Sequence, residues 1–214
     1  DLRMSRGLGD VYKRQGLHMA NKIITISREF GSGGRFIGEE VAKKLGMKYY
    51  DKDIISQIAE KLGFSKEYIS QNAELSPKKG LFAYALTGRD TTGKSVEDMV
   101  YEAQRKVILE IAENDSCVII GRNADYILKD RTDVINIFIH ADMPEKVKRI
   151  CRLYNVTETE AVAMTADIDK RRMTNYRYYT DQKWGMARNY TLTLNSSQLG
   201  YDMCEKIIME CAQQ

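Results

Sequence analysis

The sequence has few of the residues that mark metal-binding or disulfide-stabilised proteins. It contains four cysteines and two histidines, with no C-x-x-C pair and no histidine at metal-ligand spacing from a cysteine. We therefore expect four reduced thiols, as in a cytoplasmic protein. This pattern argues against a secreted disulfide scaffold.

Long apolar runs and a strong excess of charge are also missing. No apolar segment approaches the roughly 20 residues that a membrane-spanning helix needs. The first 18 residues lack the apolar core of a secretory signal. Because the formal net charge is only +3, nothing global indicates binding to nucleic acid or to a membrane. We expect small-molecule partners, no membrane and no nucleic acid; nothing indicates an oligomeric state.

The remaining composition is that of one ordinary globular domain. Of the 214 residues, 43% are hydrophobic and 29% are charged, which suffices for one α/β core. Residues 1–18 show no helical or strand periodicity, so we expect a non-native leader and a natural start at Met19. A disordered basic tail is the alternative. Residues 19–214 are predicted to form a single domain.

Short apolar segments alternate with amphipathic ones along this domain. Such an alternation predicts an α/β fold with a parallel sheet and helices on both faces. About five strands are expected, each rich in apolar or β-branched residues, at 22–27 (KIITIS), 47–53 (MKYYDKD), 117–122 (CVIIGR), 134–140 (VINIFIH) and 191–196 (TLTLNS).

Helix signals lie between the predicted strands. Ile37, Val41 and Leu45 recur on one face of a helix after the first strand. Asp142 is the expected cap of a helix that opens with MPEK, where proline suits the first turn. The letters TETE from Thr157 onward have the pattern of a capping box and predict a further helix start.

Two segments compete as a phosphate-binding loop. Residues 88–95 (GRDTTGKS) fit the pattern G-x-x-x-x-G-K-[ST] at every fixed position. They follow LFAYAL, which lacks the β-branched run of a central strand, and they lie in a poorly patterned segment that begins at residue 63. A phosphate loop needs a buried strand before it and a helix after it. We therefore interpret this match as accidental.

The loop after the first predicted strand has the right context and different letters. Residues 28–35 (REFGSGGR) join a buried strand to an amphipathic helix. Its glycines let an anion approach the backbone, and Arg28 and Arg35 bracket them, with a helix N-terminus behind. A glycine-rich turn without any ligand is the alternative. We predict phosphate binding at this loop.

Polar residues at other strand ends extend the candidate site. Asp51, Arg122 and Asn123 lie at or just after the ends of predicted strands, whose carboxyl ends share the sheet edge at which such folds bind ligands. Arg122 is placed to hold a phosphate; an arginine that simply exits to solvent is the alternative. Residues 167–188 hold six basic residues among tyrosines and a tryptophan. They indicate an RNA contact, a solvated helix face or, fitting best beside a phosphate loop, a lid whose arginines close over phosphates.

Together these pieces resemble the cytidylate kinase-like family, a branch of the P-loop nucleoside monophosphate kinases. The resemblance covers about residues 21–214 and is carried by ITISREFGSGGR, KKLGMKYYDKDII, CVIIGRNADYIL, the DKRR…YRYYT…WG stretch and YTLTLNSSQLG. It implies a three-layer P-loop kinase-like fold, with a helical acceptor-binding insertion at about 63–112 and a lid at about 157–188. It also implies ATP-dependent phosphoryl transfer to a nucleoside monophosphate, CMP or dCMP first, with Mg²⁺.

The resemblance gives each candidate residue a role. The loop would cradle the donor phosphates, the second and third strand ends would face the acceptor, and the lid arginines would act in the transfer. No metal ligands are identified. The residues so implied are Arg35, Arg171, Arg172 and Arg177 for catalysis; Arg28, Gly31, Ser32, Gly33, Gly34, Arg35 and Asn195 for the donor; and Asp51, Arg122 and Asn123 for the acceptor.

The chain departs from the family's usual letters inside this loop. The family reads roughly G-P-S-G-A-G-K-S-T, whereas here Gly34 stands in place of the Lys, and Arg35 and Phe36 stand in place of Ser-Thr. Asn123 likewise replaces the Asp of a G-R-D motif. Such loops use the hydroxyl to hold Mg²⁺ and the Lys to reach the β- and γ-phosphates. A nucleotide-binding regulatory module that has lost catalysis is therefore the alternative function.

Overall fold

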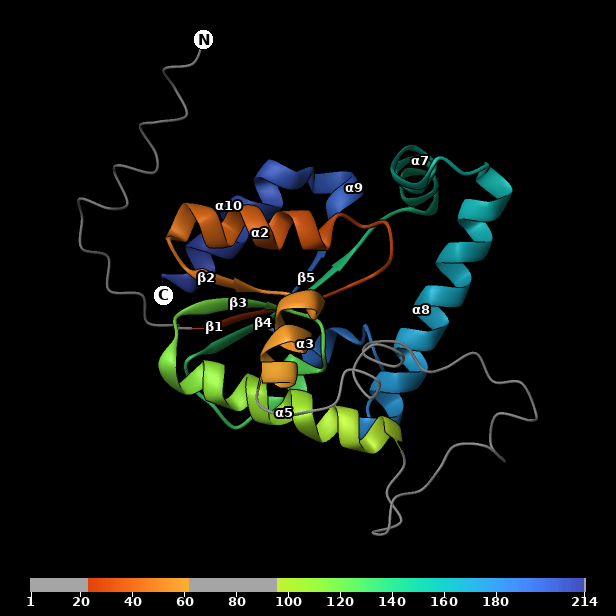
Figure 1. Cartoon of the computed structure of the whole chain (residues 1–214). Coiled ribbons are helices and arrows are strands. Elements are labelled where there is room, and N and C mark those ends of the chain that lie inside the picture. The colour runs from red at the N-terminus through yellow and green to blue at the C-terminus, as the bar shows by residue number, and fades with distance from the viewer. Residues whose placement is uncertain (1–22, 62–95, 214) are drawn as a thin grey trace.

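A five-stranded parallel sheet forms the centre of the computed structural model, which describes residues 23–61 and 96–213 (Figure 1). The strand order is β2-β3-β1-β4-β5, and every neighbouring pair is parallel. The strands are β1 (Ile23–Arg28), β2 (Lys48–Tyr50), β3 (Cys117–Ile120), β4 (Val134–His140) and β5 (Leu192–Asn195). The predicted parallel sheet is confirmed.

The third strand is shorter than predicted. It ends at Ile120 because Gly121, Arg122 and Asn123 have φ angles of 70°, 62° and 55°, which turn the chain out of the sheet. Arginine rarely adopts this conformation, so the tight turn was not visible in the apolar pattern. Its consequence is that Arg122 becomes buried instead of continuing a strand.

Helices cover both faces of the sheet (Figure 1). One face carries α2 (Gly34–Leu45), α9 (Ser196–Leu199) and α10 (Tyr201–Ala212). The other carries α3 (Lys52–Lys61), α5 (Val96–Asn114) and α6 (Ala124–Ile127). Beyond the carboxyl ends of the strands lie α7 (Met143–Tyr154) and α8 (Glu158–Thr180), and the short 3-10 helix η2 (Ala187–Asn189) precedes β5.

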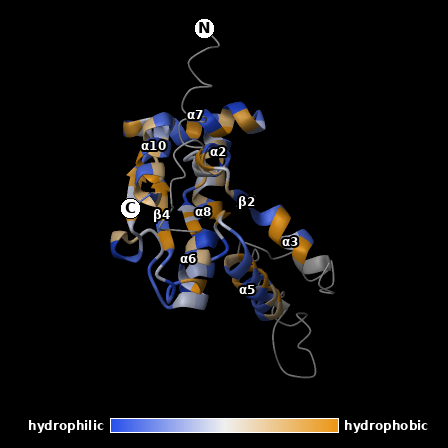
Figure 2. Cartoon of the chain, turned by 90° about the vertical axis from the view of Figure 1, so that its left-hand side faces the viewer, coloured by the Kyte–Doolittle hydropathy of each residue, from blue (hydrophilic) through white to orange (hydrophobic). Residues whose placement is uncertain are grey.

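Each face of the sheet has its own hydrophobic core. In β1, Ile24 and Ile26 belong to the cluster beneath α2 and α10, whereas Ile23 belongs to the cluster with α5. Strands buried on both faces need apolar residues on both sides, which explains the continuous apolar letters of IITI. Figure 2 shows orange and blue residues on the same helices, as expected of helices with one buried face. The predicted three-layer fold is confirmed.

The two predicted helix caps behave differently. Thr157 and Glu160 form the predicted capping box, in which each side chain accepts a hydrogen bond from the other residue's backbone N–H. Asp142 takes the cap position of α7, but its side chain makes no capping bond. Its carboxylate instead accepts a hydrogen bond from Asn195 Nδ2 at 2.9 Å. Asp142 therefore ties α7 to the end of β5.

The predicted insertion at about 63–112 lies only partly within the described residues. The competing loop at 88–95 and the leader at 1–18 lie outside them. From Val96 onward the segment is α5, and Val107, Ile108 and Ile111 pack in the core on one face of the sheet. This part belongs to the main core, and a role of the insertion in acceptor binding stays a prediction. Within the described residues, no helix is long and apolar enough to span a membrane.

We expect Ile37→Ala to lower the free energy of unfolding by roughly 2–5 kcal/mol, because the substitution opens a cavity beneath α2. Ile37 is fully buried between this helix and the sheet. Lys43→Ala, at an exposed position of the same helix, is the control and should change stability by less than about 0.5 kcal/mol. Urea unfolding of both variants measures the difference. Equal effects would contradict the assigned burial.

Candidate active site

The turn from β1 into α2 forms the floor of the candidate site. Gly31 and Gly33 have φ angles of 80° and 81°, a conformation that favours glycine. A Cβ atom on Gly33 would also lie 2.5 Å from the Tyr201 hydroxyl oxygen, and one on Gly31 would lie 2.9 Å from Ile150 Cδ1. Both backbone geometry and space therefore require glycine here. The turn directs the N-terminus of α2, with its backbone N–H groups, toward the carboxyl edge of the sheet.

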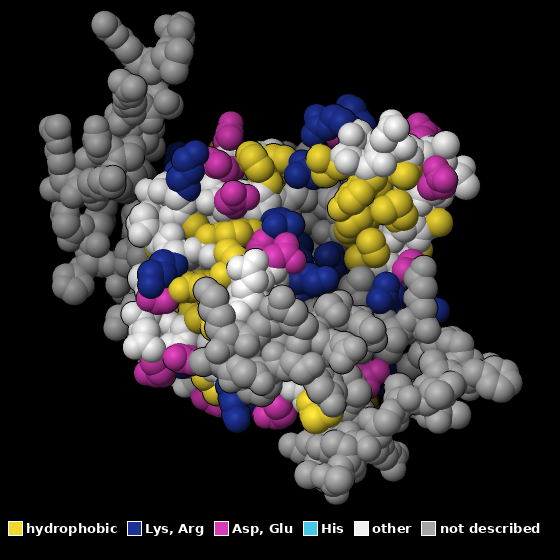
Figure 3. All heavy atoms as spheres, in the orientation of Figure 1, with side chains coloured by type: hydrophobic (Ala, Val, Ile, Leu, Met, Phe, Trp, Pro, Cys, Tyr) yellow, Lys and Arg dark blue, Asp and Glu magenta, His cyan; other side chains and the backbone are white. Residues whose placement is uncertain are grey.

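A cavity of about 380 Å³ opens beside this turn. Its walls come from the turn itself, the start of α3, and helices α7 and α8. Figure 3 shows Lys and Arg side chains gathered in a hollow of this face, with Asp or Glu and hydrophobic side chains beside them. The charged residues that line the cavity are Arg28, Glu29, Arg35, Glu39, Asp51, Lys52, Asp53, Arg149 and Arg172.

Arg35 extends from the first turn of α2 toward the start of α3. Its NH2 atom lies 2.5 Å from Asp51 Oδ2 and 3.8 Å from Asp53 Oδ2. The side chain of Asp51 is only 7% exposed, and its other oxygen accepts the backbone N–H groups of Asp53 and Ile54. The fold thus brings together a residue predicted to bind the donor and one predicted to face the acceptor.

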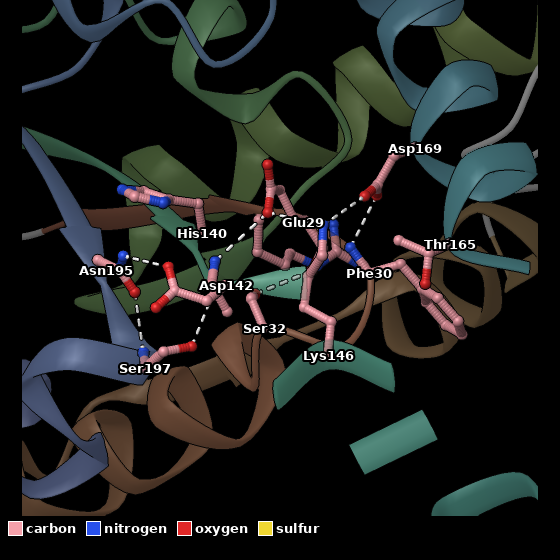
Figure 4. A network of polar contacts seen from close by, with 12 residues as sticks. Glu29, Phe30, Ser32, His140, Asp142, Lys146, Thr165, Asp169, Asn195 and Ser197 are labelled. Carbon is pink, nitrogen blue, oxygen red and sulfur yellow. Dashed lines mark hydrogen bonds and ion pairs between the residues drawn. The ribbon is translucent and has the colours of Figure 1, made fainter. Parts of the chain in front are cut away.

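Lys146 of α7 is a buried cation beneath the turn (Figure 4). Its Nζ atom lies 2.9 Å from Glu29 Oε2 and 3.5 Å from Asp169 Oδ2, and 6% of its side chain is exposed. Burial raises the pKa of Asp169 above its ordinary value. Sequence reasoning missed Lys146 and Asp169, because their connection to the loop exists only in the folded chain.

Helix α8 also contacts the backbone of the turn directly. The N–H of Phe30 donates a hydrogen bond to Asp169 Oδ1 at 2.7 Å (Figure 4). Arg172 donates from NH1 to the carbonyl oxygen of Arg28 at 3.1 Å. The segment predicted as a lid is therefore anchored to the glycine-rich turn in this structure. Its closing over a ligand stays a prediction.

Ser32 and Asn195 form hydrogen bonds that stabilise the local structure at the carboxyl edge of the sheet. The hydroxyl of Ser32 donates to the carbonyl oxygen of Glu29 at 2.9 Å, which tightens the turn. Asn195 Oδ1 accepts the N–H of Ser197 and so caps α9, while its Nδ2 donates to Asp142 (Figure 4). Neither side chain lines the cavity. Their assignment to donor binding stays a prediction.

Four other predicted site residues also lie outside the cavity lining. Arg122 and Asn123 are buried, and Asn123 Nδ2 donates to Asn175 Oδ1 at 3.3 Å. Arg171 lies 3.8 Å from Asp167 on its own helix, and Arg177 is exposed. Of the three arginines predicted for the lid, the fold brings only Arg172 to the cavity. The other roles stay predictions.

Arg149 is a cavity residue that sequence reasoning missed. It lies on α7, and its NH1 atom donates a hydrogen bond to the hydroxyl of Tyr201, the group that packs against Gly33. The guanidinium carbon Cζ of Arg149 also lies over the ring of Tyr201, 5.1 Å from the centre of the ring. Helix α7 carries four basic residues, and their spacing gives no signal for which of them turns toward the site.

Asp125 is another residue that sequence reasoning missed, and it is buried where three elements meet. The hydroxyl of Tyr176 in α8 donates a hydrogen bond to Asp125 Oδ2 at 2.7 Å. The hydroxyl of Ser27, near the end of β1, donates a longer hydrogen bond of 3.5 Å to Asp125 Oδ1. Burial raises the pKa of Asp125 to about 6. The contact with Tyr176 stabilises the charged form, but desolvation dominates because the residue is only 4% exposed.

The residues at this edge fit phosphate groups better than a magnesium ion held by the protein. Arginine side chains and N–H groups at a helix start are good phosphate ligands. In contrast, no group of three or more His, Cys, Asp or Glu side chains among residues 23–61 and 96–213 is placed to hold a metal. Arg35 stands where the family's hydroxyl would bind Mg²⁺, and Asp51 is already engaged. The hydroxyl that binds Mg²⁺ at this position of the family's loop is therefore absent here.

A parallel α/β sheet, a glycine-rich turn at a helix start and an arginine-lined cavity define the class of P-loop kinase-like proteins. The profile of the cytidylate kinase-like family matches residues 23–198, and the chain belongs to this family. A protein named cytidylate kinase from Archaeoglobus fulgidus is 25% identical over 195 residues, which is 89% of this chain and 94% of that protein.

Solved structures show the same architecture. An uncharacterized protein from Eubacterium ventriosum is 25% identical, with a TM-score of 0.71, covering 90% of this chain and 98% of that one. Shikimate kinase from Acinetobacter baumannii, solved in complex with shikimate, is 16% identical with a TM-score of 0.52, covering 94% and 96%. This second likeness shows the fold alone. Membership of this family supports a nucleotide kinase activity in general.

The raised pKa of Asp125 predicts a pH-dependent stability. Because the folded pKa of about 6 exceeds the unfolded value of about 3.9, the folded state binds this proton more tightly. The contribution of Asp125 to the free energy of unfolding is therefore fully present below pH 4 and is lost as pH rises through 6. Relative to Asp125→Asn, we expect the wild-type free energy of unfolding to fall by roughly 2 kcal/mol between pH 4 and 7.5.

Urea unfolding at several pH values checks this expectation. Asp130→Asn, a substitution at an exposed carboxylate on the same short segment, controls for the loss of one negative charge. Its difference from the wild type should stay nearly constant across the range. A constant difference for Asp125→Asn as well would show that burial does not perturb Asp125.

Proposed function

We propose that this protein transfers a phosphoryl group from ATP to a nucleoside monophosphate, with CMP or dCMP as the first acceptor to test. The observation that carries the proposal is the convergence of Arg28, Arg35, Arg149 and Arg172 on one cavity at the glycine-rich turn. Membership of the cytidylate kinase-like family supports it, as does the similarity to a protein named cytidylate kinase.

The charges around the cavity suit phosphoryl transfer. During the transfer, negative charge lies on the phosphate oxygens, and fixed positive groups stabilise it without having to reorganise. Arg149 and Arg172 approach from α7 and α8, whereas Arg35 approaches from α2. ATP would supply the phosphoryl group, with its phosphates against the turn and the start of α2. The guanidinium groups would then surround the transferring group from different sides.

The pair of Arg35 and Asp51 suits a position between the two substrates. Asp51 is held by α3 through two backbone N–H groups, so its orientation is fixed before any ligand arrives. The salt bridge in turn orients Arg35, whose side chain is 63% exposed and open to a ligand. In the proposed reaction, Arg35 binds phosphate oxygens and Asp51 positions it against the acceptor.

The hydrophobic wall of the cavity suits a nucleobase. Leu153 and Tyr154 line it at the end of α7, and both side chains are more than half exposed. The ring of Tyr154 lies 5.7 Å from that of Phe30. An aromatic surface beside a phosphate site binds the two ends of a nucleotide by different forces, stacking at one end and charge at the other.

The test is ADP release from ATP with CMP, dCMP, UMP, AMP or dephospho-coenzyme A, each with Mg²⁺ and with EDTA. Shikimate, which one of the fold neighbours binds, is added as a sixth acceptor. We expect turnover on one acceptor. Arg35→Ala should lower kcat/KM by about tenfold to a thousandfold, because it removes a charge from the transition state. Lys43→Ala on the same helix is the control.

An Arg35→Ala variant at the wild-type rate would contradict the role given to this residue. ATP binding without turnover on any acceptor would favour the second candidate function, a nucleotide-binding regulatory module. The absence of the loop lysine and hydroxyl is the observation that favours this alternative. Turnover that is lost in a cavity variant would exclude it.

Two arginines of α7 give a matched comparison. Arg149 lines the cavity, whereas Arg152, one turn further, is exposed and does not line it. We expect Arg149→Ala to weaken ATP binding by about tenfold or more, since it removes a charged phosphate contact. Arg152→Ala removes the same charge and should stay within about twofold of the wild type. Isothermal titration with ATP measures both, and equal losses would refute a local contact by Arg149.

A further inference from the structure

The backbone conformation at Gly34 does not require glycine. Gly34 is the first residue of α2, and the helical backbone conformation at this position is open to residues other than glycine. A Cβ atom at this position would lie 2.6 Å from Cβ and 3.1 Å from Cγ of Arg28. Ile139 Cβ would be 3.4 Å away on another side. Space, and mainly the stem of the Arg28 side chain, therefore keeps this residue a glycine.

This contact joins the two ends of a displaced motif. In G-x-x-x-x-G-K-[ST], the first position is glycine and the seventh is the lysine that reaches the phosphates. Residues 28–34 (REFGSGG) keep the glycine at the sixth position, but the first is Arg28 and the seventh is Gly34. Glycine and cation have exchanged places, and the two positions are in contact in the fold.

We propose that Arg28 binds the donor phosphates in place of the missing loop lysine, and that Gly34 is the space which this exchange requires. The inference rests on the proposed function and names the residue that would supply the positive charge of the missing loop lysine. Arg28 lines the cavity, so the cation is supplied from the end of β1 instead of the start of α2. A guanidinium also offers a planar fork that binds two phosphate oxygens at once.

The position of Arg28 is well fixed for this role. It is the last residue of β1 and pairs in register with Ile139 of β4. Its carbonyl oxygen accepts a hydrogen bond from Arg172, which lines the same cavity. The next residue, Glu29, donates its backbone N–H to the carbonyl oxygen of Ile139 at 2.9 Å. The side chain thus begins from the rigid centre of the sheet, as a phosphate contact needs.

The exchange makes positions 28 and 34 interdependent. Arg28→Gly alone removes the cation and leaves a loop with glycine at both ends. Gly34→Lys alone forces a new side chain against the Arg28 stem, so one of the two must shift. The double variant, Arg28→Gly with Gly34→Lys, restores both the space and a lysine at the seventh position. The effects of the two substitutions should therefore not add.

The experiment is a double-variant cycle measured by isothermal titration with ATP and, separately, with inorganic tripolyphosphate. We expect each single variant to bind both probes about tenfold or more weakly, and the double variant to recover to within about threefold of the wild type. Arg28→Lys, which keeps a charge but loses the fork, should fall between. A double variant as weak as the two single losses combined would overturn the proposal.

Thermal unfolding of the wild type, the two single variants and the double variant gives a readout that needs no ligand. Gly34→Lys should lower Tm, and adding Arg28→Gly should restore it, because the clash is between these two residues. If the wild type binds ATP and turns over but the double variant does not regain binding, this inference alone is overturned. Recovery of binding without any turnover would instead overturn the proposed function. A wild-type chain that binds neither probe would overturn both.

Discussion

The reversal of the chain between β1 and α2 is the constraint on which the site depends. The strand β1 lies between β3 and β4 at the centre of the sheet, and its last residue, Arg28, pairs with Ile139 of β4. The chain must turn within a few residues to lay α2 on the sheet, and Gly31 and Gly33 make this possible with left-handed backbone angles. The same turn receives Tyr201 from α10 and Ile150 from α7. One backbone geometry thus fixes the helix start and the neighbours that surround the cavity.

Charge pairing holds two of the cavity arginines, Arg35 and Arg172, in place before any ligand is present. Several guanidinium groups in a small volume repel one another, and nearby carboxylates offset this repulsion. Asp51 serves Arg35, and Asp169 lies between Lys146 and Arg172, 3.5 Å from the first and 3.6 Å from the second. Asp169 also accepts the N–H of Phe30. Each carboxylate therefore bonds to the backbone as well as to a cation, which keeps the cations oriented at the turn.

The fold followed from local patterns, whereas the site followed only in part. Apolar strands, the face of α2 and the capping box at Thr157 are written in neighbouring residues, and the structure confirms them. The turn at REFGSGGR was found for the same reason. Arg149 and Asp125 were missed because their roles come from contacts across the fold, with Tyr201 and Tyr176. No period or spacing in a single segment encodes such contacts.

Two departures from the usual loop letters coincide with contacts in the folded chain. Gly34 stands in place of the lysine, and the stem of Arg28 lies where a side chain at this position would begin. Arg35 replaces the hydroxyl that binds Mg²⁺ in the family's loop, and it forms a salt bridge with Asp51 instead. A short motif records which letters occupy a loop, but phosphate binding depends on which charges reach it. In this chain four arginines, from β1, α2, α7 and α8, line the cavity beside a loop with few of the expected letters.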